Sequence, residues 1–444
     1  MTTSSILILI AFIALVTSPY FLRRFSKATT DSYGAFAVGA RNFGWFRICA
    51  GLSATFVGGA AVINLAGLGY SFGWYGLADV IPTSAALVFS ALIIVPMLAA
   101  KKAVSLGGYL RGSSKLAGAA TGLLSAVVYT LICAAQIIAL VKVTQPFFPA
   151  VPAPAIACIG TLAVAGYIFF GGYSAVTVTD VIQFVVMTVF YFALVGGTLV
   201  LVGSASVGPA IQTQPMSTDL LILLSLSLLF VPISQDVHIR INSAKSPRDA
   251  RTGVLLAGLV YFVFGLISVS VGFTMSKAGI VLGSPDDAVP TFLASHFGAF
   301  AVIPTIAVIC VVVSTLDSVL FASASSLAYD FWDSVSSRNR EKDSAHPRIA
   351  TLIVLGVALF IAMQTPQILK LILSALIIYI AVLFPMLIGR FLKKDSRALG
   401  ILAFIALAAV IAMESYGYKV AFRAFVYAGV HLAGVLLVKK EQVA

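Results

Sequence analysis

The chain has 444 residues, of which 60% are hydrophobic and only 10% are charged. A soluble domain carries roughly 25% charged residues, so this composition excludes a soluble globular protein. A helix needs about 20 apolar residues to cross the hydrocarbon, and backbone polar groups there must bond within the protein. We therefore expect an all-α polytopic membrane protein.

Apolar segments long enough to span a bilayer recur along the whole chain. We expect about thirteen transmembrane helices, with ends uncertain by several residues, at 4–22, 47–71, 76–98, 115–142, 153–172, 176–203, 219–241, 253–275, 299–331, 348–364, 367–389, 398–415 and 420–438. No polar segment between them is long enough to fold as a soluble domain. The segment around Gly283–Asp287, before the span at 299, is either an external cap or a plain connector.

The basic residues are distributed unevenly between the two sides of these spans. With the N-terminus outside, 23 of the 28 Lys and Arg residues, Arg240 among them, fall on inner segments. Cytoplasmic loops retain positive charge, so we expect a multi-pass protein of the plasma (inner) membrane with a cytoplasmic C-terminus. Topology accounts for the net charge of +12. We therefore expect the lipid bilayer as partner, no nucleic acid and no obligate protein partner.

The first span is not typical of a cleaved signal peptide, because it lacks a basic leading region and a small-residue cleavage site. We interpret residues 1–46 as an extra helix with a cytoplasmic loop. The four cysteines are widely spaced, which favours buried, reduced thiols over disulfides or a metal site. His238, His296, His346 and His431 are scattered, so no spacing supports an enzyme's nucleophile and base.

Small residues interrupt the second span around Gly58-Gly59. Tight helix packing is one explanation, since small residues let membrane helices approach closely. The functional interpretation is an unwound turn near Ala54 to Gly59, whose carbonyls coordinate an ion and whose glycines admit a substrate.

The seventh span contains a comparable interruption at Pro232, followed by Ser234 and Gln235. Proline removes a donor and clashes with the preceding turn. Interrupted helices in corresponding positions of two halves indicate a transporter with an inverted repeat and a central binding site. We expect a five-plus-five arrangement with two broken helices: 47–218 and 219–392 as the repeats, then 393–444 as two C-terminal helices and a short tail.

The ninth span becomes polar in mid-helix at Ser314-Thr315-Leu316-Asp317-Ser318. Residues 314, 317 and 318 share a helix face, and a carboxylate at membrane depth is a functional-site hypothesis by default. Asp180, near the inner end of the sixth span, is the second such carboxylate. No Lys or Arg within a span is an obvious partner for either one, so we expect a bound cation to supply the charge.

In order and spacing, these fragments resemble the sodium:solute symporter family from about Ala40 to Arg390. The resemblance rests on Gly39–Gly44, Gly67–Tyr70, Gly171-Gly172 with Thr179–Gln183, Arg240 with Ala244–Ser246, and Ser314–Ser318 with Asp330. It implies a symporter with Na⁺ as coupling ion, a small organic solute as substrate, and the five-plus-five inverted-repeat transporter fold.

The resemblance also implies residue roles. The principal sodium site would be formed by Ala54, Val57, Val311, Ser314 and Thr315. A second sodium site would use Asp180, Asp317 and Ser318 together with Ser314. The substrate would lie against Phe56, Gly58, Gly59, Ala61, Ser234 and Gln235. Asp79, on the next helix, is a weaker candidate, for which an outer-end position in water is the better explanation.

Ala60 and Ala61 stand where sugar-transporting members have polar side chains, which argues against a sugar. The Phe56–Gly59 stretch is similar to the choline-transporting branch, although a packing role for Phe56 is the simpler explanation. We predict sodium-coupled import by alternating access. The alternatives are coupling to protons through Asp180 or Asp317, and a transporter-like sensor with little flux.

Overall fold

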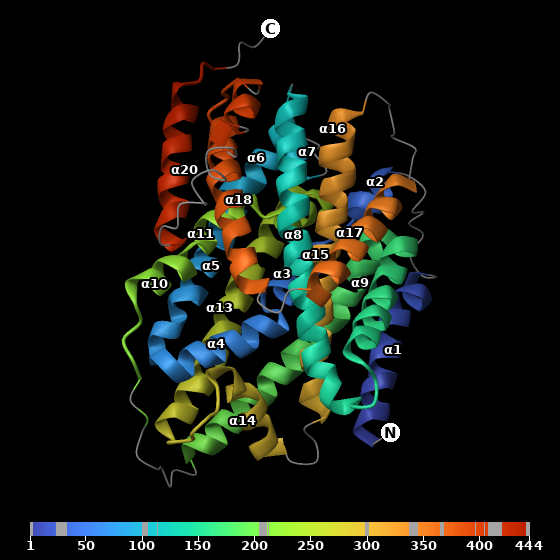
Figure 1. Cartoon of the computed structure of the whole chain (residues 1–444), viewed down its shortest axis with the longest axis vertical. Helices are drawn as coiled ribbons and strands as arrows, with labels where there is room; N and C mark the ends of the chain where they lie inside the picture. Colours follow the sequence, from blue (N-terminus) through green and yellow to red (C-terminus); the bar gives the residue numbers. More distant parts are fainter. Residues whose placement is uncertain are drawn as a thin grey trace.

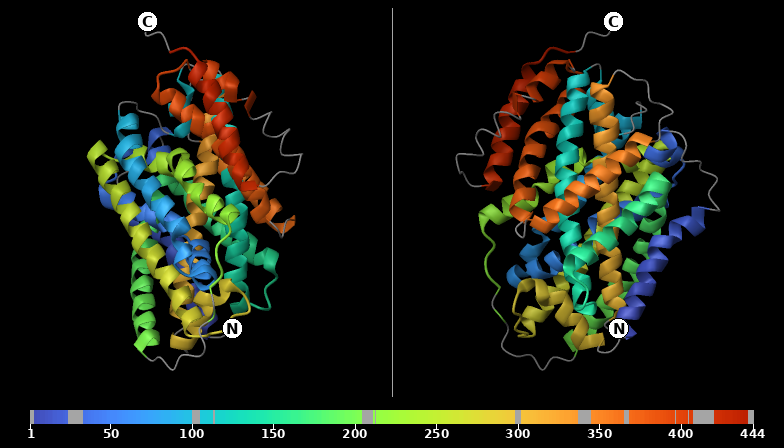
Figure 2. Two further views of the ribbon diagram at one scale, coloured as in Figure 1. Left: turned by 90° about the vertical axis from the view of Figure 1, so that its left-hand side faces the viewer. Right: turned by 45° about the vertical axis from the view of Figure 1, so that its right-hand side comes forward.

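The structure is a computed structural model that describes residues 3–23, 33–99, 105–112, 114–203, 211, 213–297, 302–336, 345–364, 368–395, 397–403, 405–406 and 420–440. These residues form an elongated bundle of helices, with the N-terminal helix and the C-terminus at opposite ends (Figures 1 and 2). The only β pairing among them is two isolated bridges. The expected all-α class is confirmed.

The first described segments lead into the first interrupted helix. Helix α1 (Thr3–Arg23) packs on α9 and α15, and short segments α2 (Tyr33–Val38) and η1 (Gly39–Arg41) follow. The interrupted helix consists of α3 (Trp45–Phe56) and α4 (Gly59–Phe72). The single turn η2 (Gly73–Gly76) then leads to α5 (Leu77–Phe89), the π-helix η3 (Ser90–Ile94) and α6 (Val95–Ala99).

Two long helices follow the short helix α7 (Leu106–Arg111). Helix α8 (Lys115–Thr144) and the turn η4 (Gln145–Phe147) lead to α9 (Ala153–Gly203). Gly172 has φ 56° and ψ −152° inside α9, which divides it between the predicted spans 153–172 and 176–203. A Cβ on Gly172 would lie 2.9 Å from the Phe36 carbonyl oxygen. Glycine therefore makes this turn, since it adopts positive φ without strain.

The second interrupted helix comprises α10 (Thr218–Ser225), α11 (Ser227–Phe230), the 3₁₀ turn η5 (Val231–Ile233) and α12 (Gln235–Ser243). Ser234 between η5 and α12 is extended, with ψ 124°. Next come α13 (Pro247–Lys277), η6 (Pro285–Asp287) and α14 (Ala288–Phe297). The segment around Gly283–Asp287 therefore consists of a 3₁₀ turn that leads into a short helix, and both alternatives, a cap and a connector, stay open.

The last part of the chain is again helical. It contains α15 (Val302–Ser325), the π-helix η8 (Ser326–Trp332), α16 (Asp333–Val335), α17 (Ala345–Gln364), α18 (Ile368–Phe391) and α20 (Val420–Leu437). Most of the predicted span 398–415 lies outside the described residues. Among those described, eight helices are long and apolar enough to cross a membrane, with shorter apolar helices besides, so the count of thirteen stays a prediction.

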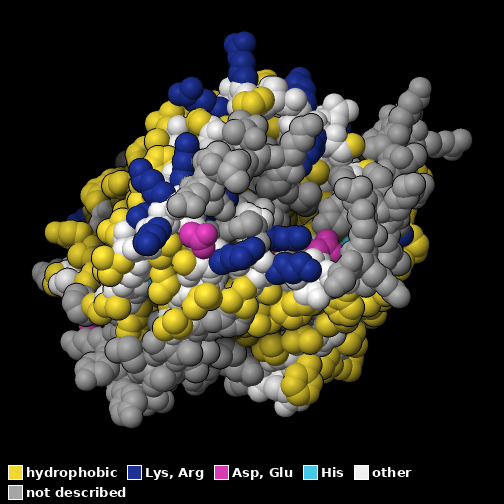
Figure 3. All heavy atoms as spheres, turned by 90° about the horizontal axis from the view of Figure 1, so that it is seen from above, with side chains coloured by type: hydrophobic (Ala, Val, Ile, Leu, Met, Phe, Trp, Pro, Cys, Tyr) yellow, Lys and Arg dark blue, Asp and Glu magenta, His cyan; other side chains and the backbone are white. Residues whose placement is uncertain are grey.

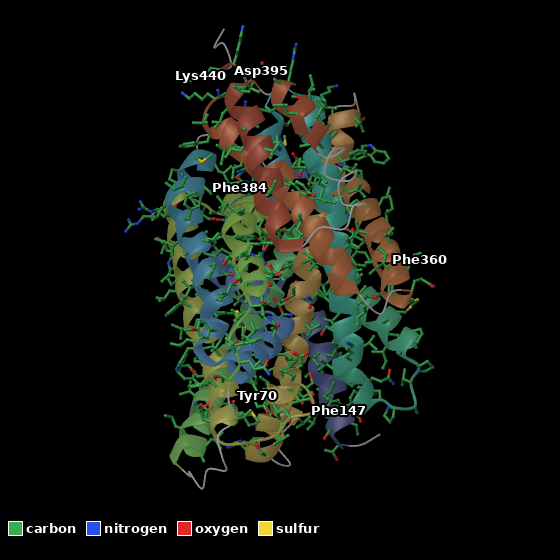
Figure 4. The ribbon with its side chains drawn as sticks, turned by 60° about the vertical axis from the view of Figure 1, so that its left-hand side comes forward. Tyr70, Phe147, Phe360, Phe384, Asp395 and Lys440 are labelled. Carbon is green, nitrogen blue, oxygen red and sulfur yellow. The ribbon has the colours of Figure 1, made fainter. Side chains whose placement is uncertain are left out.

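The interior of the bundle is where the two interrupted helices meet long, intact ones. Helix α13 packs on α3, α4 and α5, while α15 packs on α8, α9 and α3. Tyr70 and Phe147 lie toward one end of the molecule, and Asp395 and Lys440 lie at the other (Figure 4). Val57 and Ser234, at the two interruptions, are completely buried. Both interruptions are therefore enclosed by protein, the setting in which irregular backbone is tolerated at membrane depth.

Candidate functional site

The first interruption is confined to Val57 and Gly58. Helix α3 stays regular through Phe56, and the Val57 N–H still bonds the Ser53 carbonyl at 2.9 Å. Gly58 then turns extended, with ψ 157°. In the described part of the chain, no backbone hydrogen bond reaches the carbonyls of Ala54 or Val57. The unwound turn is therefore shorter than the predicted Ala54–Gly59, but both predicted ligand carbonyls are available.

Thr315 links this break to α15. Its hydroxyl Oγ1 lies 3.3 Å from the carbonyl oxygen of Thr55 and 3.3 Å from that of Val311. A Cβ on Gly58 would come within 2.3 Å of the same Oγ1. Glycine at position 58 thus makes room for the hydroxyl against the broken helix. The carbonyl end of α3 also carries the partial negative charge of the helix dipole, so a cation is favoured beside it.

Ser314 faces a different neighbour. Its hydroxyl donates to Asp180 Oδ1 at 3.0 Å, and both side chains are completely buried. The structure therefore brings Thr315 to the broken helix and Ser314 to the carboxylate of α9. Adjacent hydroxyls on α15 bridge two separate elements.

Asp180 has a cationic partner, contrary to the prediction. Arg240 Nη2 lies 3.0 Å from Asp180 Oδ2, and the Arg240 side chain is only 2% exposed. The same nitrogen donates to Thr55 Oγ1 at 2.6 Å and to Ser318 Oγ at 2.8 Å. The prediction was wrong because it placed Arg240 on an inner basic loop, whereas α12 carries it into the interior. One guanidinium there joins α3, α9 and α15.

A second carboxylate reinforces this position of Arg240. Asp236, one helical turn earlier on α12, places Oδ2 3.8 Å from Arg240 Nη1. Its other oxygen accepts from the Tyr129 hydroxyl at 2.7 Å. All nine residues of α12 are buried, so this short polar helix is stabilised by interactions with its neighbours. Two carboxylates around one guanidinium satisfy the rule that buried charges are paired.

Asp317 is held in another way. Its Oδ2 accepts hydrogen bonds from Tyr167 and from Thr179, the latter at 2.9 Å. Both donors belong to α9. Its Oδ1 is buried without a hydrogen-bond partner among the described residues. Asp317 therefore has no arginine within ion-pair distance in this part of the chain and presents one open oxygen.

At the second interruption, the Gln235 side chain bonds residues of α7 and η8 and, within the described residues, makes no bond to the first interruption. Its Oε1 accepts from the Leu106 N–H at 3.0 Å, and its Nε2 donates to Asp330 Oδ2 at 3.1 Å. The Ser105 hydroxyl bonds the other oxygen of Asp330. The Gln235 amide therefore ties the break to α7 and η8. Ser234, also fully buried, is the extended residue of the break itself.

A small polar group lies beside the first break on its other side. The ring of Phe56 meets that of Tyr261 edge-on, with centroids 6.4 Å apart. The Tyr261 hydroxyl donates to Asp79 Oδ2 at 2.8 Å. Asp79 is half-buried, and its place at the solute site stays a prediction. Phe56 and Asp79 thus border the same face of α13.

Sequence reasoning missed several participants: Thr55, Tyr129, Tyr167, Asp236 and the interior position of Arg240. One signal was available for the last pair. Asp236 and Arg240 are four residues apart, the spacing at which opposite charges meet on a helix, in a segment already expected to be buried. Tyr167 and Thr55 carry no such signal, because single tyrosines and threonines are ordinary in membrane helices.

Comparison with known proteins gives a consistent result. A sequence model of the sodium:solute symporter family matches residues 36–406. A Na⁺-coupled sialic acid symporter, in a substrate-bound outward-open state, superposes with a TM-score of 0.79 at 12% identity over 100% of both chains. The nucleobase-cation-symport-1 transporter Mhp1, closed with bromovinylhydantoin bound, gives 0.60 at 15% identity over 92% of this chain and 94% of its own. No curated protein sequence matches.

Proposed function

Because the chain belongs to the sodium:solute symporter family, we propose that it imports a small organic solute together with sodium by alternating access. Family membership makes it an integral multi-pass membrane transporter coupled to sodium, and not an enzyme. The solute, the direction of transport and the residues that bind each ligand belong to the proposal. The N-terminus outside and the C-terminus in the cytoplasm are also proposed, from the basic inner segments.

The proposed principal sodium site consists of the carbonyls of Ala54, Val57 and Val311 with the hydroxyls of Ser314 and Thr315. The observation that carries it is the Thr315 hydroxyl, 3.3 Å from both the Thr55 and Val311 carbonyl oxygens. It lies between the unpaired turn of α3 and the facing helix. Hard cations are bound by oxygen ligands of this kind. Ser314 would reach the ion by rotating from Asp180, 3.0 Å away.

Sodium at this position would hold the broken helix to α15. Coupling to solute then requires that sodium favour one conformation over another, because a ligand shifts an equilibrium only by its differential affinity. The solute would occupy the space beside the two breaks, against Phe56, Gly58, Gly59, Ala61, Ser234 and Gln235, with Asp79 at the margin. By linkage, sodium and solute should each tighten the other by the same factor.

A second sodium at Asp180, Asp317 and Ser318 is the weaker part of the proposal. Arg240 already contacts Asp180 and Ser318, so an ion there would compete with the guanidinium. Asp317 Oδ1 supports an ion at this place because it is buried and has no partner among the described residues.

The deciding experiment is a thermal-stability titration of the detergent-purified chain with sodium, against potassium and choline at constant ionic strength. We expect saturable stabilisation by sodium alone, lost in Thr315→Ala. Ser323→Ala is the matched control, because it removes a buried hydroxyl of the same helix that bonds the Ala126 carbonyl of α8 and belongs to neither proposed sodium site. No sodium-specific response in a folded wild type would overturn the proposal and favour proton coupling or a sensor.

Uptake in proteoliposomes, once a screen in sodium has found a solute, separates the two ligands. Ser314→Ala should weaken sodium and solute together, whereas Ser234→Ala should weaken mainly the intrinsic binding of solute. An unchanged sodium dependence in Ser314→Ala would remove that residue from the site.

A further inference from the structure

A polar cavity lies away from the transport site, between the segment before α3 and the start of α13. Its volume is about 110 Å³, which is room for several waters at roughly 10–15 Å³ each. Tyr70, at the opposite end from Lys440 (Figure 4), bonds Ile280 just after α13. The start of α13 therefore faces the end of the molecule that carries the C-terminus.

The polar lining of this cavity offers donors rather than carboxylates. Arg41 and Lys245 line it together with Asn242. Asn242 is 5% exposed, and its Nδ2 has no hydrogen-bond partner among the described residues. Lys245 is 56% exposed, with Asp249 Oδ1 3.8 Å from its Nζ. Asp249 is not part of the lining, and Arg248 beside it offsets its charge.

The walls of the cavity are fixed by backbone hydrogen bonds. The Phe43 N–H bonds the Ser243 carbonyl at 3.2 Å, and the Lys245 N–H bonds the Phe43 carbonyl at 2.9 Å. Arg41 Nη1 donates to the Asn242 carbonyl oxygen at 3.1 Å. The 31-residue helix α13 begins at Pro247, on the cavity's edge, and a helix N-terminus favours negative charge. These bonds tie η1 and the residue before α3 to the segment between α12 and α13, so the residues that line the cavity are held in place.

Apolar side chains complete the lining. Val95 and Leu98 of α6 and Ile241 of α12 lie on the cavity wall. This combination of two cations, an amide donor that is free of partners in the described part of the chain, and aliphatic groups suits an anion attached to a hydrocarbon chain. Lys and Arg side chains also gather on the surrounding end face, seen in Figure 3. Basic pockets between membrane helices bind the head groups of anionic lipids.

We propose that this cavity binds the phosphate group of an anionic phospholipid, with Lys245, Arg41 and Asn242 as its donors. The site is independent of which solute the protein carries. It lies where η1, which precedes the first interrupted helix, meets the end of α12, the last part of the second interrupted helix. A lipid bound there would stabilise the contact between these two segments.

The test uses the full chain in nanodiscs of phosphatidylcholine, with and without phosphatidylglycerol, and reads thermal stability and the number of retained lipids by native mass spectrometry. We expect phosphatidylglycerol to stabilise the wild type. Lys245→Ala should weaken the response about five-fold, from roughly one kcal/mol per basic residue at a membrane surface. Asn242→Asp, nearly identical in shape, should abolish it. Lys439→Ala, which removes an exposed cation from the same end, should leave it unchanged.

Three outcomes would overturn the proposal. An equal response in Lys245→Ala, Lys439→Ala and wild type would show diffuse attraction to the basic end rather than a site. Stabilisation by inorganic phosphate in detergent, lost in the same two variants, with no effect of phosphatidylglycerol, would replace the lipid by a free anion. No response in any sample would remove the site. If Asn242→Asp is unstable in phosphatidylcholine alone, Lys245→Ala decides the matter.

Discussion

The two interrupted helices differ in the chemical groups that they place at their breaks. The break between α3 and α4 is made from small residues and exposes main-chain carbonyls at Ala54 and Val57. The break before α12 is followed by charged and amide side chains, among them Asp236 and Arg240, all buried. The first break carries no charge of its own. The second supplies a cation that reaches across to the first.

The difference suggests separate roles for the two breaks in the proposed transport cycle. An uncharged set of oxygens has to bind and release sodium repeatedly, so its affinity has to stay modest. A buried guanidinium between two carboxylates is not released, because separating it would leave charges unpaired in the interior. We therefore interpret the first break as the exchanging side and the second as the fixed side, and the following substitutions test that contrast.

Arg240→Gln should have the largest effect. It leaves Asp180 and Asp236 without their cation, and breaking a buried ion pair costs about 3–5 kcal/mol. We expect a corresponding fall in the unfolding free energy of the purified protein, measured by thermal denaturation. Adding Asp180→Asn should recover part of the loss, since the two sites interact directly. Full additivity of the two single effects would contradict the ion pair.

Gln235→Leu should come next. It leaves Asp330 Oδ2 and the Leu106 N–H without their partner, and each unsatisfied buried group costs about 1–3 kcal/mol. Hydrogen exchange of the α7 amides should rise, since the Gln235 amide accepts from that helix. Gln235→Glu is the comparison: it keeps the acceptor for Leu106 but replaces the donor to Asp330. If the α7 amides of Gln235→Leu exchange hydrogen as slowly as those of the wild type, Gln235 does not stabilise α7.

Gly58→Ala should destabilise by about 1–2 kcal/mol, as typical of overpacking, and should remove the sodium response. The new Cβ would lie 2.3 Å from Thr315 Oγ1. Combining Gly58→Ala with Thr315→Ala removes the clash, so stability should return while the response to sodium stays lost. A sodium response preserved in Gly58→Ala would separate this glycine from the ion site.

The smallest effect is expected for Tyr261→Phe, which removes the donor to Asp79 at 2.8 Å. A single hydrogen bond contributes about 0.5–1.5 kcal/mol. Stability should change little, and the solute affinity should change only if Asp79 borders the solute. Thermal denaturation and solute binding, measured on the same samples, distinguish the two effects.

How much of this site was visible in the sequence depends on the kind of interaction. The breaks at Gly58 and Pro232 were predicted because glycine and proline act locally on the backbone, and the polar face at 314–318 follows from helical spacing. The partners of those residues were not predicted. Arg240 meets Asp180 across 60 positions of the chain, and Tyr167 meets Asp317 across 150. Such pairings depend on how helices cross, which periodicity does not encode.

Helix α1 has a consequence for how the molecule is made. It packs against α9 and α15, and α15 begins about 280 residues after α1 ends. At roughly 5–20 residues per second, a ribosome would need about 15–55 s to deliver that partner. Large apolar side chains on α1, such as Ile10, Ile13 and Phe21, remain more than half exposed even in the finished bundle. A helix with such an apolar surface can stay in the bilayer without a protein partner while the rest of the chain is synthesised. Its side that packs on α9 and α15 would exchange lipid for protein contacts only after α15 is in place.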